Sequence, residues 1–570
     1  MSQRKRKLSI EETHQIINSD AEDIFDESDS DEDFVPIAEN ETDDSNTSSS
    51  ESEVDVGFEG SNATEEVNLP NILSKDKSII WHDQPLPNSR GKIPRNQILC
   101  RSPGPSKCAI SMVTDIKSSF DIFMPSSIKN IVVEMSNIKG LQLFGDNWKI
   151  IDLIELEAYI GLQILAGVYK SHNESLIHLW DENNGRPIFR ATMSLERLMN
   201  ISRCLRFDSA ADRDERRQRD KLAPIRNIWD QWNRQLRSYY HLHENVTIDE
   251  QLVPFRGRCS FRQYIPSKPA KYGLKIWALC DSKSKYAWNM EVYLGRARNT
   301  QPERNQGERV VLSLSEPLPR GHTITCDNFF TTYNLAVQLL RRNITLVGTV
   351  RKNKLFLPRE IVEIKEKNIL ESKYLFTENV TIVSYVPKKY KFVVALSSLH
   401  HSPLVDEGDR KKREIILHYN KTKAGVDALD QLFANYTCKR QTKRWPVALF
   451  SNMLDISAYN AYVIWTKINP LWNTNKLYKR RLFLEELGKQ MVEPNIVRRE
   501  RLPRGIAAKN ILKNIQENSK SAEEAPTSNI SARSESTKKR QRCFIIQKIR
   551  TNIQLFVVRA KNLFSRNTAA

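Results

Sequence analysis

The chain has 570 residues, with 87 Lys and Arg against 69 Asp and Glu and a formal net charge of +18 at pH 7. This length exceeds one typical domain, so we expect two or three folded units with large hydrophobic cores. The basic balance favours a polyanionic partner, most commonly nucleic acid, because each phosphate contact by Lys or Arg releases counterions. Eight cysteines without a CxxC pair argue against a disulfide framework and fit reduced thiols in an intracellular protein.

The first segment, residues 1–75, is rich in Asp, Glu and Ser and has little apolar surface to bury, so we expect an acidic, disordered tail. Its basic run RKRK at 4–7 is typical of nuclear import signals, and a similar run, KKRQR, recurs at 538–542. We therefore expect the protein in the nucleus. Residues 76–119 are expected to form a linker.

Residues 120–245 carry apolar side chains at helical spacing, for example in LIELEAYIGLQILAGVY (153–169) and IRNIWDQWNRQLRSYYHLH (225–243). This pattern predicts a helical domain. The apolar stretch 156–169 is too short and too polar to span a bilayer, which takes about 20 apolar residues. No membrane segment is expected.

The pattern changes to short β-rich segments at residue 246. Strands followed by a strand, a helix and a strand predict an α/β fold, with a mixed sheet covered by helices, over 246–435. Further strands over about 356–410 predict a β-rich insertion, and helical spacing returns over 436–515. Residues 516–570 are expected to be a linker and a basic tail.

Four aspartates are placed where carboxylates can converge. Asp249 and Asp327 each follow an apolar strand segment, and strand ends are frequent positions for functional side chains. Asp427 and Asp430 are three residues apart and share a helical face, with Val426 and Leu429 expected to pack that helix onto the sheet. Taken singly, aspartates at such positions mostly cap or turn the backbone, and that alternative stays open.

The helical pair favours a cation between the two acids, because like charges at this spacing cost roughly 0.2 to 0.5 kcal/mol. A divalent cation would supply that charge, and carboxylates suit Mg²⁺ or Mn²⁺. Two such ions can activate water and stabilise the leaving oxygen in phosphodiester cleavage. The residues alone therefore indicate a metal-dependent phosphoryl-transfer site.

Basic residues with an interleaved aromatic residue flank these acids and are typical of a surface that binds a nucleic-acid backbone and stacks a base. Each lysine alone could simply be a solvated surface residue, and Trp445 is equally compatible with core packing. The candidate DNA-binding residues are Lys268, Lys271, Lys275, Arg351, Lys354, Lys439, Arg440, Lys443, Arg444 and Trp445.

Six segments in order resemble the piggyBac family of transposases over about 120–515. They are TIDEQLVPFRGR (247–258), KPAKYGLKIW (268–277), TCDNFFTTYNLAVQL (325–339), LVGTVRKNK (346–354), YNKTKAGVDALDQL (419–432) and RQTKRWP (440–446). The resemblance implies a ribonuclease H-like catalytic domain with a β-rich insertion, flanked by a helical dimerisation and DNA-binding domain split into 120–245 and 436–515.

The resemblance also implies roles for individual residues. Asp249, Asp327 and Asp427 correspond to the family's three essential aspartates, and Asp430 to a fourth, supporting acid of the metal site. Arg351, Lys354 and Trp445 are expected near the DNA ends. The implied partners are double-stranded DNA, as transposon ends and TTAA target, and a second copy of the chain in a homodimer.

Two departures from the family pattern are visible. The C-terminal stretch 542–567 has the basic framing of the family's zinc module but keeps only Cys543, with Ile546, Leu555, Val558 and Phe564 roughly where further cysteines would stand. We therefore expect no zinc site, since such a site needs about four Cys or His ligands. Ala424 replaces a common glycine, a minor change unless the position needs positive φ.

Two functions remain open at this point. The intact acids favour an active, metal-dependent transposase that cleaves transposon ends and joins them to TTAA target DNA. The altered tail favours a transposon-derived protein that binds DNA or chromatin without transposition.

Overall fold

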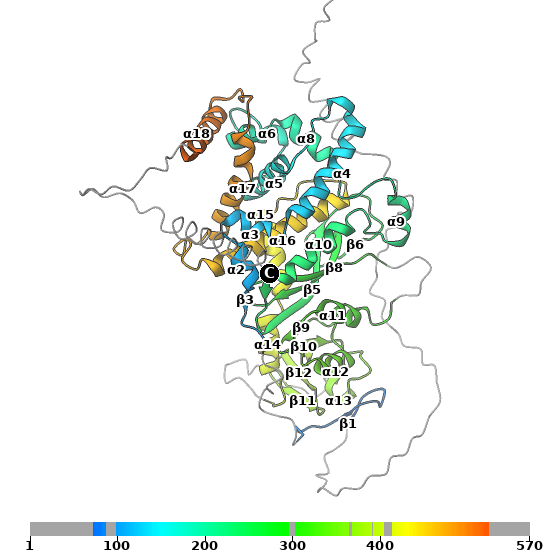
Figure 1. Cartoon of the computed structure of the whole chain (residues 1–570). Helices are drawn as coiled ribbons and strands as arrows, with labels where there is room; N and C mark the ends of the chain where they lie inside the picture. Colours follow the sequence, from blue (N-terminus) through cyan, green and yellow to red (C-terminus); the bar gives the residue numbers. More distant parts are fainter. Residues whose placement is uncertain are drawn as a thin grey trace, which may run out of the picture. The chain divides into compact units, whose positions relative to one another are not determined.

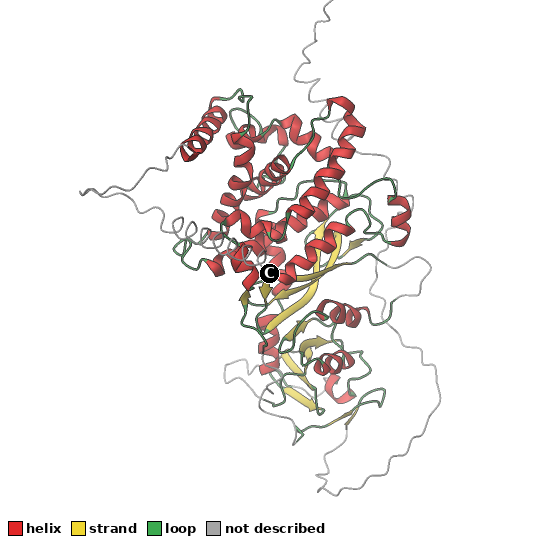
Figure 2. Cartoon of the chain, in the orientation of Figure 1, coloured by secondary structure: helices red, strands yellow, loops and turns green. Residues whose placement is uncertain are grey.

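The computed structural model describes residues 72–86, 99–295, 303–363, 368–389, 391–403 and 413–523. Within these ranges strands β5 to β13 form one mixed sheet of nine strands, against which helices pack (Figure 1, Figure 2). The chain divides after Gln516 into two compact units. The sheet and the helices up to Val497 belong to the first unit.

Strand β5 (Asn245–Pro254) lies in the middle of the sheet. It pairs antiparallel with β7 (Tyr272–Asp281) and parallel with β9 (Thr323–Cys326), and β10 (Thr345–Val350) lies parallel beside β9. The outer side of β7 pairs with β6 (Arg262–Tyr264) and β8 (Ala287–Val292). Strand β7 is buried along almost its whole length, as its near-continuous apolar run predicts for a strand covered on both faces.

Three further strands continue this sheet beyond β10. They are β11 (Ser372–Phe376), β12 (Thr381–Lys388) and β13 (Lys391–Ser397), and β13 pairs antiparallel with β10. These are the strands expected between residues 356 and 410. Side chains that alternate along β10, β12 and β13 belong to two separate cores, one on each face. Helix α12 (Tyr333–Arg341) packs on one face and α14 (Glu414–Thr422) on the other.

The remaining helices come before β5, between the strands of the sheet and after α14. Those before are α2 (Lys107–Met112), α3 (Ile116–Asp121), α4 (Ser126–Phe144), the 3-10 helix η3 (Gly145–Asn147), α5 (Leu153–Val168), α6 (Leu176–Leu179), α7 (Pro187–Thr192), α8 (Leu195–Cys204), α9 (Arg213–Arg219) and α10 (Arg226–Ser238). Within and after the sheet region lie α11 (Gln306–Ser315), α13 (Arg359–Val362), α15 (Gly425–Tyr436), α16 (Trp445–Ile468), α17 (Lys479–Val497) and α18 (Ile506–Glu523).

The two helical segments pack together although the sheet separates them in sequence. Helix α17 packs along α5, and α16 packs along α3. The Trp232 indole nitrogen on α10 donates to the Ser457 hydroxyl on α16 at 2.8 Å. One hydrophobic core therefore runs from the helices into the sheet. In the described ranges, none of the helices combines the length and apolarity that crossing a bilayer requires.

The expectation of a linker at 76–119 is wrong, because several short elements fold there. Strands β1 (Ile72–Leu73) and β2 (Ile80–Trp81) form a hairpin, and β3 (Gly104–Pro105) pairs with β4 (Tyr240–His241), followed by α2 and α3. Such short elements leave no periodic pattern in the sequence. The disorder expected for residues 1–75 lies outside the described residues except for 72–75, which belong to this folded segment.

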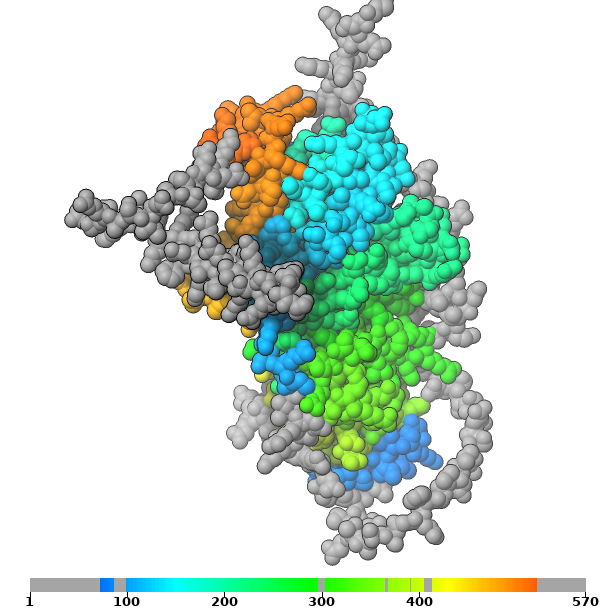
Figure 3. Space-filling view, viewed as in Figure 1, coloured from blue at the N-terminus to red at the C-terminus, as the bar shows by residue number. Residues whose placement is uncertain are grey.

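The β1–β2 hairpin is held by residues far away in the sequence. Trp81 is fully buried, and its indole nitrogen donates to the Phe356 carbonyl at 3.1 Å. His82 pairs with Phe376 of β11, and the Lys75 ammonium donates to the Lys352 carbonyl at 2.7 Å. Figure 3 shows the hairpin in blue against the yellow-green surface of this part of the sheet.

Helices α14 and α15 are anchored to the central strands through threonines. The Thr247 hydroxyl of β5 donates to the Thr422 carbonyl at 2.7 Å, and the Thr422 and Thr325 hydroxyls are 2.8 Å apart. A Cβ at Gly425 would lie 2.3 Å from the Thr247 hydroxyl oxygen, so only glycine allows helix α15 to approach β5 this closely. Ala424 has φ −85°, so its position does not require glycine.

We expect Gly425→Ala to destabilise the protein by about 1 to 3 kcal/mol, because the added methyl group has to push α15 away from β5. The urea midpoint of the metal-free chain measures this. Gly505→Ala is the matched control, since its Cβ would meet only the flexible Glu182 carboxylate at 3.1 Å. Equal midpoints for the two variants would contradict the close approach of α15.

Candidate active site

Asp249 and Asp327 lie at the same level of two neighbouring parallel strands. Thr247 of β5 pairs with Thr325 of β9, and each aspartate comes two residues after its threonine. Burial raises the pKa of Asp249 to about 8, and the nearby charges of Glu250 and Asp327 add to this rise. Burial also raises the pKa of Asp327. Asp249 lies within β5 rather than at its end, whereas Asp327 directly follows β9, and the pairing of Thr247 with Thr325 brings both to one level of the sheet.

The loop after Asp327 is fixed by its own hydrogen bonds. The Phe329 amide donates to the Asp327 carboxylate at 2.9 Å, and the Thr331 hydroxyl donates to the Asp327 carbonyl at 2.7 Å. The Phe329 ring stacks on Trp277 of β7, with centroids 5.6 Å apart. These contacts hold the backbone after Asp327, and the Phe329 amide restrains the Asp327 carboxylate.

Helix α15 carries the third acid, Asp427, and is held on the sheet by its buried face. Val426 and Leu429 are buried, as expected, and pack the helix onto the sheet. The two acids of this helix differ in environment: the Asp427 side chain is 54% exposed, whereas Asp430 is half-buried. Burial raises the pKa of Asp430 to about 7, although a hydrogen bond from Gln251 and the charge of Lys268 oppose the rise.

The cation beside the helical acids is a lysine. The Lys268 ammonium lies 3.0 Å from the Asp427 carboxylate and donates to the Glu250 carbonyl, also at 3.0 Å. Burial lowers the pKa of Lys268, but the surrounding acids Asp427, Glu250 and Asp249 outweigh this effect and raise it. The helical pair alone therefore does not require a metal ion, since Lys268 supplies the positive charge that the sequence argument assigned to a divalent cation.

The donor atoms suit a hard cation, but the acids are not gathered into one ligand set. Among the described residues, no three His, Cys, Asp or Glu side chains are placed so that a single metal ion would be held by all of them. Asp249 and Asp327 are within electrostatic reach of each other, while the Asp427 carboxylate is turned to Lys268. Carboxylate oxygens are the ligands that Mg²⁺ and Mn²⁺ prefer.

Tyr419 is a site residue that the sequence did not single out. It lies on α14, one turn before Thr422, and its hydroxyl is 3.5 Å from the Thr349 hydroxyl of β10. Burial raises its pKa, and the charges of Asp327 and Asp249 contribute. Only the pairing of α14 with the strands brings the tyrosine to the acids, so no sequence spacing could have indicated it.

Three of the candidate DNA-binding residues, Arg351, Lys271 and Lys443, lie next to an acid or at the exposed surface. The Arg351 guanidinium donates to the Asn328 side chain at 3.2 Å, next to Asp327. Lys271 is exposed and has φ +55° in the turn that follows Lys268. Lys354 is half-buried and Lys443 is exposed.

Lys275 lies among aromatic rings. Its ammonium is 4.0 Å from the centre of the Trp277 ring and 5.4 Å from that of Phe329, which places it beside the loop after Asp327. Such cation–π contacts stabilise the rings that hold this loop.

The basic segment 439–445 contributes to internal packing. Arg440 donates to the carbonyls of Ser171 and Glu174, and Arg444 to the carbonyls at the end of α8, including that of Leu205. Trp445 is only 6% exposed and packs edge-to-face on Phe261. Of the two alternatives for Trp445, the structure favours core packing. Lys439 is half-buried, and burial lowers its pKa.

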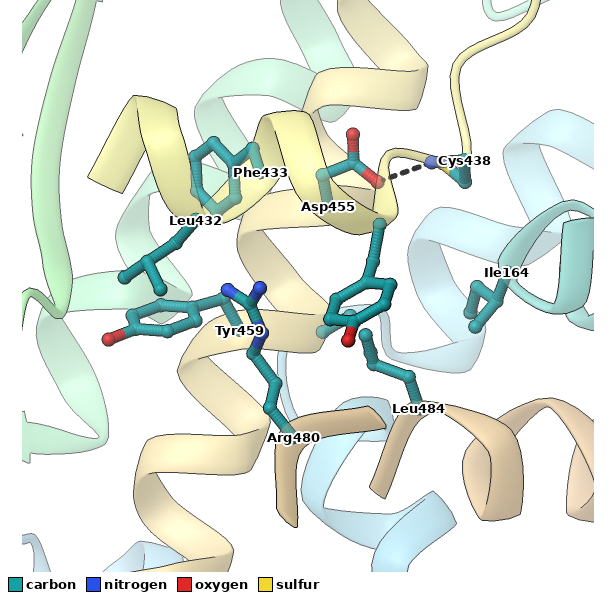
Figure 4. A pocket seen from close by; sticks show the side chains of 10 residues that line it. Ile164, Leu432, Phe433, Cys438, Asp455, Tyr459, Arg480 and Leu484 are labelled. Atoms are coloured by element: carbon teal, nitrogen blue, oxygen red, sulfur yellow. Dashed lines mark hydrogen bonds between the residues drawn. The ribbon is translucent and has the colours of Figure 1, made fainter. Parts of the chain in front are cut away.

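A cavity of about 20 Å³ lies at the other end of α15 and has room for about one water molecule (Figure 4). It is lined by Cys438 and by residues of α5, α15, α16 and α17, among them the half-buried Asp455 of α16 and Arg480 of α17. The Asp455 carboxylate accepts hydrogen bonds from the Cys438 amide at 2.8 Å and the Thr437 hydroxyl at 2.6 Å. None of the candidate catalytic acids lines this cavity, and the hydrogen bonds to Asp455 hold the segment between α15 and α16.

Comparisons with known proteins agree with this arrangement. The family of transposases described as Transposase IS4 matches residues 117–462. PiggyBac transposable element-derived protein 3 of Homo sapiens is 24% identical over 430 residues, which are 68% of this chain and 70% of that protein. PiggyBac transposable element-derived protein 2 of Homo sapiens is 22% identical over 396 residues, 64% of this chain and 63% of that protein.

A solved structure is also similar. The piggyBac transposase in a synaptic complex with hairpin DNA superposes with a TM-score of 0.68 at 33% identity, covering 73% of this chain and 87% of that one. The family match spans more than half of the chain, and the solved structure shares its fold. The chain therefore belongs to the piggyBac family of transposases.

Proposed function

We propose that this protein is a metal-dependent DNA transposase whose essential acids are Asp249, Asp327 and Asp427. The observation that carries this proposal is that Asp249 and Asp327 each come two residues after the paired threonines of β5 and β9, with the helix that bears Asp427 anchored to the same two strands. Acids whose pKa values are raised by burial and by each other are typical of functional sites rather than of surface caps.

We infer that the sheet forms a ribonuclease H-like catalytic domain. Its five central strands lie in the order β8, β7, β5, β9 and β10, and β7 is antiparallel to its neighbours while β5, β9 and β10 are parallel. In this arrangement β11 to β13 are an insertion between Asp327 and Asp427 that lengthens the sheet. The helices on either side would form the split domain for dimerisation and DNA binding.

Asp249, Asp327 and Asp427 would hold Mg²⁺ or Mn²⁺, with Asp430 supporting them. The bound ions would activate water and stabilise the leaving oxygen of the scissile phosphodiester. The proposed reaction frees a 3′-hydroxyl at each transposon end, and that hydroxyl attacks the opposite strand to give a hairpin. The reopened end is then joined to target DNA at TTAA, and no covalent link to the protein is needed.

Double-stranded DNA is the proposed partner. Support comes from the net charge of +18, from the exposed basic residues near the acids and from the DNA in the similar synaptic complex. A homodimer and a nuclear location complete the proposal. The basic runs at 4–7 and 538–542, which motivate the nuclear location, lie outside the described residues.

A second candidate function is DNA or chromatin binding without transposition. The observation that favours it is the stretch 542–567, where Cys543 is the only cysteine. This stretch also lies outside the described residues. The cleavage experiment that follows separates the two functions.

The purified full chain should convert a pre-nicked terminal-repeat duplex into a hairpin in Mg²⁺, as detected on a denaturing gel. Asp327→Asn should lower the rate by more than about 100-fold, because Asp327 is a proposed direct ligand. Loss of a residue that only supports the ligands of a metal typically costs about 10- to 100-fold. Asp430→Asn is the matched variant and should lower the rate by about 10- to 100-fold. DNA binding without any hairpin would support the second function, and a rate unchanged by Asp327→Asn would overturn the first.

The metal-free protein should lose stability as the pH rises from about 4 to 8. The pKa values of Asp249 and Asp430 are raised to about 8 and about 7, so the folded chain binds more protons than the unfolded chain in this window. Urea unfolding in EDTA between pH 5.5 and 8.5 measures the slope of the free energy of unfolding against pH. Asp249→Asn should make it shallower, and a slope identical to that of the wild-type chain would show that Asp249 does not titrate there.

The affinity for duplex DNA should fall steeply with salt, because phosphate contacts release counterions. Replacing Lys271 and Lys443 by alanine should lower the slope of log K against log[salt] by about 1 for each lost contact. Lys467→Ala, an exposed lysine at the end of α16, serves as the control and should leave the slope unchanged. A flat response of the wild-type chain would exclude extensive phosphate contact.

A further inference from the structure

The turn between β6 and β7 places one ammonium group among four carboxylates. Lys268 lies in the segment 265–271, which is closed by a hydrogen bond from the Ile265 amide to the Lys271 carbonyl at 2.7 Å. From there its side chain, 16% exposed, reaches Asp427 and the Glu250 carbonyl, each at 3.0 Å. Its charge also acts on Asp249, Glu250 and Asp430.

This position is unusual for a DNA-binding lysine. The Lys268 side chain is only 16% exposed, and its ammonium already donates to a carboxylate and a backbone carbonyl instead of facing solvent alone. The Asp427 carboxylate is more exposed than its partner, so it can rotate away from Lys268 without leaving α15. The Lys268–Asp427 ion pair can therefore open, so that Asp427 can take another cation as its partner.

We propose that Lys268 is a stand-in cation, which neutralises the acids of the metal-free protein and has to release Asp427 before Asp427 can bind a divalent cation. This inference rests on the proposed metal site. Lys268 is a positioning residue in this role, because in the metal-free protein it holds the Asp427 carboxylate close to the Glu250 backbone carbonyl. It thereby lowers the affinity for the metal and limits the repulsion among the acids.

The physical reason is the repulsion between two cations on one carboxylate, since the Lys268 ammonium already bonds to Asp427. An ammonium and a divalent cation compete for the same carboxylate, and each repels the other at contact distance. The metal gains Asp427 only when Lys268 moves out. In the DNA complex the released ammonium could then bind a phosphate group. Lys268 could therefore pair with Asp427 in the metal-free protein and still contact DNA in the complex.

Mn²⁺ binding to the purified, DNA-free full chain tests this, with free Mn²⁺ followed by electron paramagnetic resonance. Lys268→Met removes the charge but keeps the side-chain length, and it should bind Mn²⁺ roughly fivefold more tightly than the wild-type chain. Lys268→Arg should stay close to wild type. Lys271→Met is the matched control for loss of a nearby charge, and should change the affinity by less than about twofold.

Asp249→Asn and Asp327→Asn separate failure of this inference from failure of the proposed function. If these two variants weaken Mn²⁺ binding but Lys268→Met binds as the wild-type chain does or more weakly, the stand-in role is wrong and the metal site remains. If neither aspartate affects Mn²⁺ binding, both proposals fall.

A second measurement uses the wild-type chain and so does not depend on the folding of a variant. Acylation by an amine-reactive ester, read by mass spectrometry, should be slow at Lys268 in EDTA and several-fold faster in saturating Mg²⁺, while Lys271 reacts equally in both. Equal reactivity of Lys268 with and without Mg²⁺ would overturn the inference.

Discussion

The candidate site depends on the anchoring of the α14–α15 junction to β5 and β9. Thr247 and Thr325 pair across the two strands, and both of their hydroxyls bond to Thr422. Gly425 then brings the start of α15 against Thr247. These contacts are buried, so each hydroxyl that lost its partner would remain unsatisfied at a cost of about 1 to 3 kcal/mol. This junction positions three acids of the site, because Asp249, Asp327 and Asp427 each come two residues after one of its members.

The electrostatics of the site follow from the same geometry. Strands and helix bring acids together before any metal is present, so burial and mutual repulsion raise the pKa values of Asp249, Asp327 and Asp430. Lys268 is the cationic side chain that meets this group of charges from the β6–β7 turn. The acids therefore repel one another in the metal-free protein, and a divalent cation would relieve this repulsion. Metal binding would in this way stabilise the fold.

The basic residues of the chain divide into two groups with different physical roles. Arg440 and Arg444 donate to the ends of helical segments near 171–174 and 202–205, and thus join the two helical segments of the protein. Arg351 and Lys271 remain close to the acids or on an exposed turn, where DNA could reach them. A single charge run such as KRQTKR therefore contains both structural and exposed cations, and charge alone does not separate them.

The sequence by itself determined the main elements and singled out the candidate acids. Periodic apolar spacing marked α5, α10 and α16, and apolar runs marked β5, β7 and β9, because burial of one face or of both faces leaves a pattern in neighbouring residues. Only the tertiary structure decided which side chains meet. The contact between Lys268 and Asp427, the place of Tyr419 and the burial of Trp445 all join residues from different elements. Such contacts are set by strand pairing and helix docking, which no local spacing records.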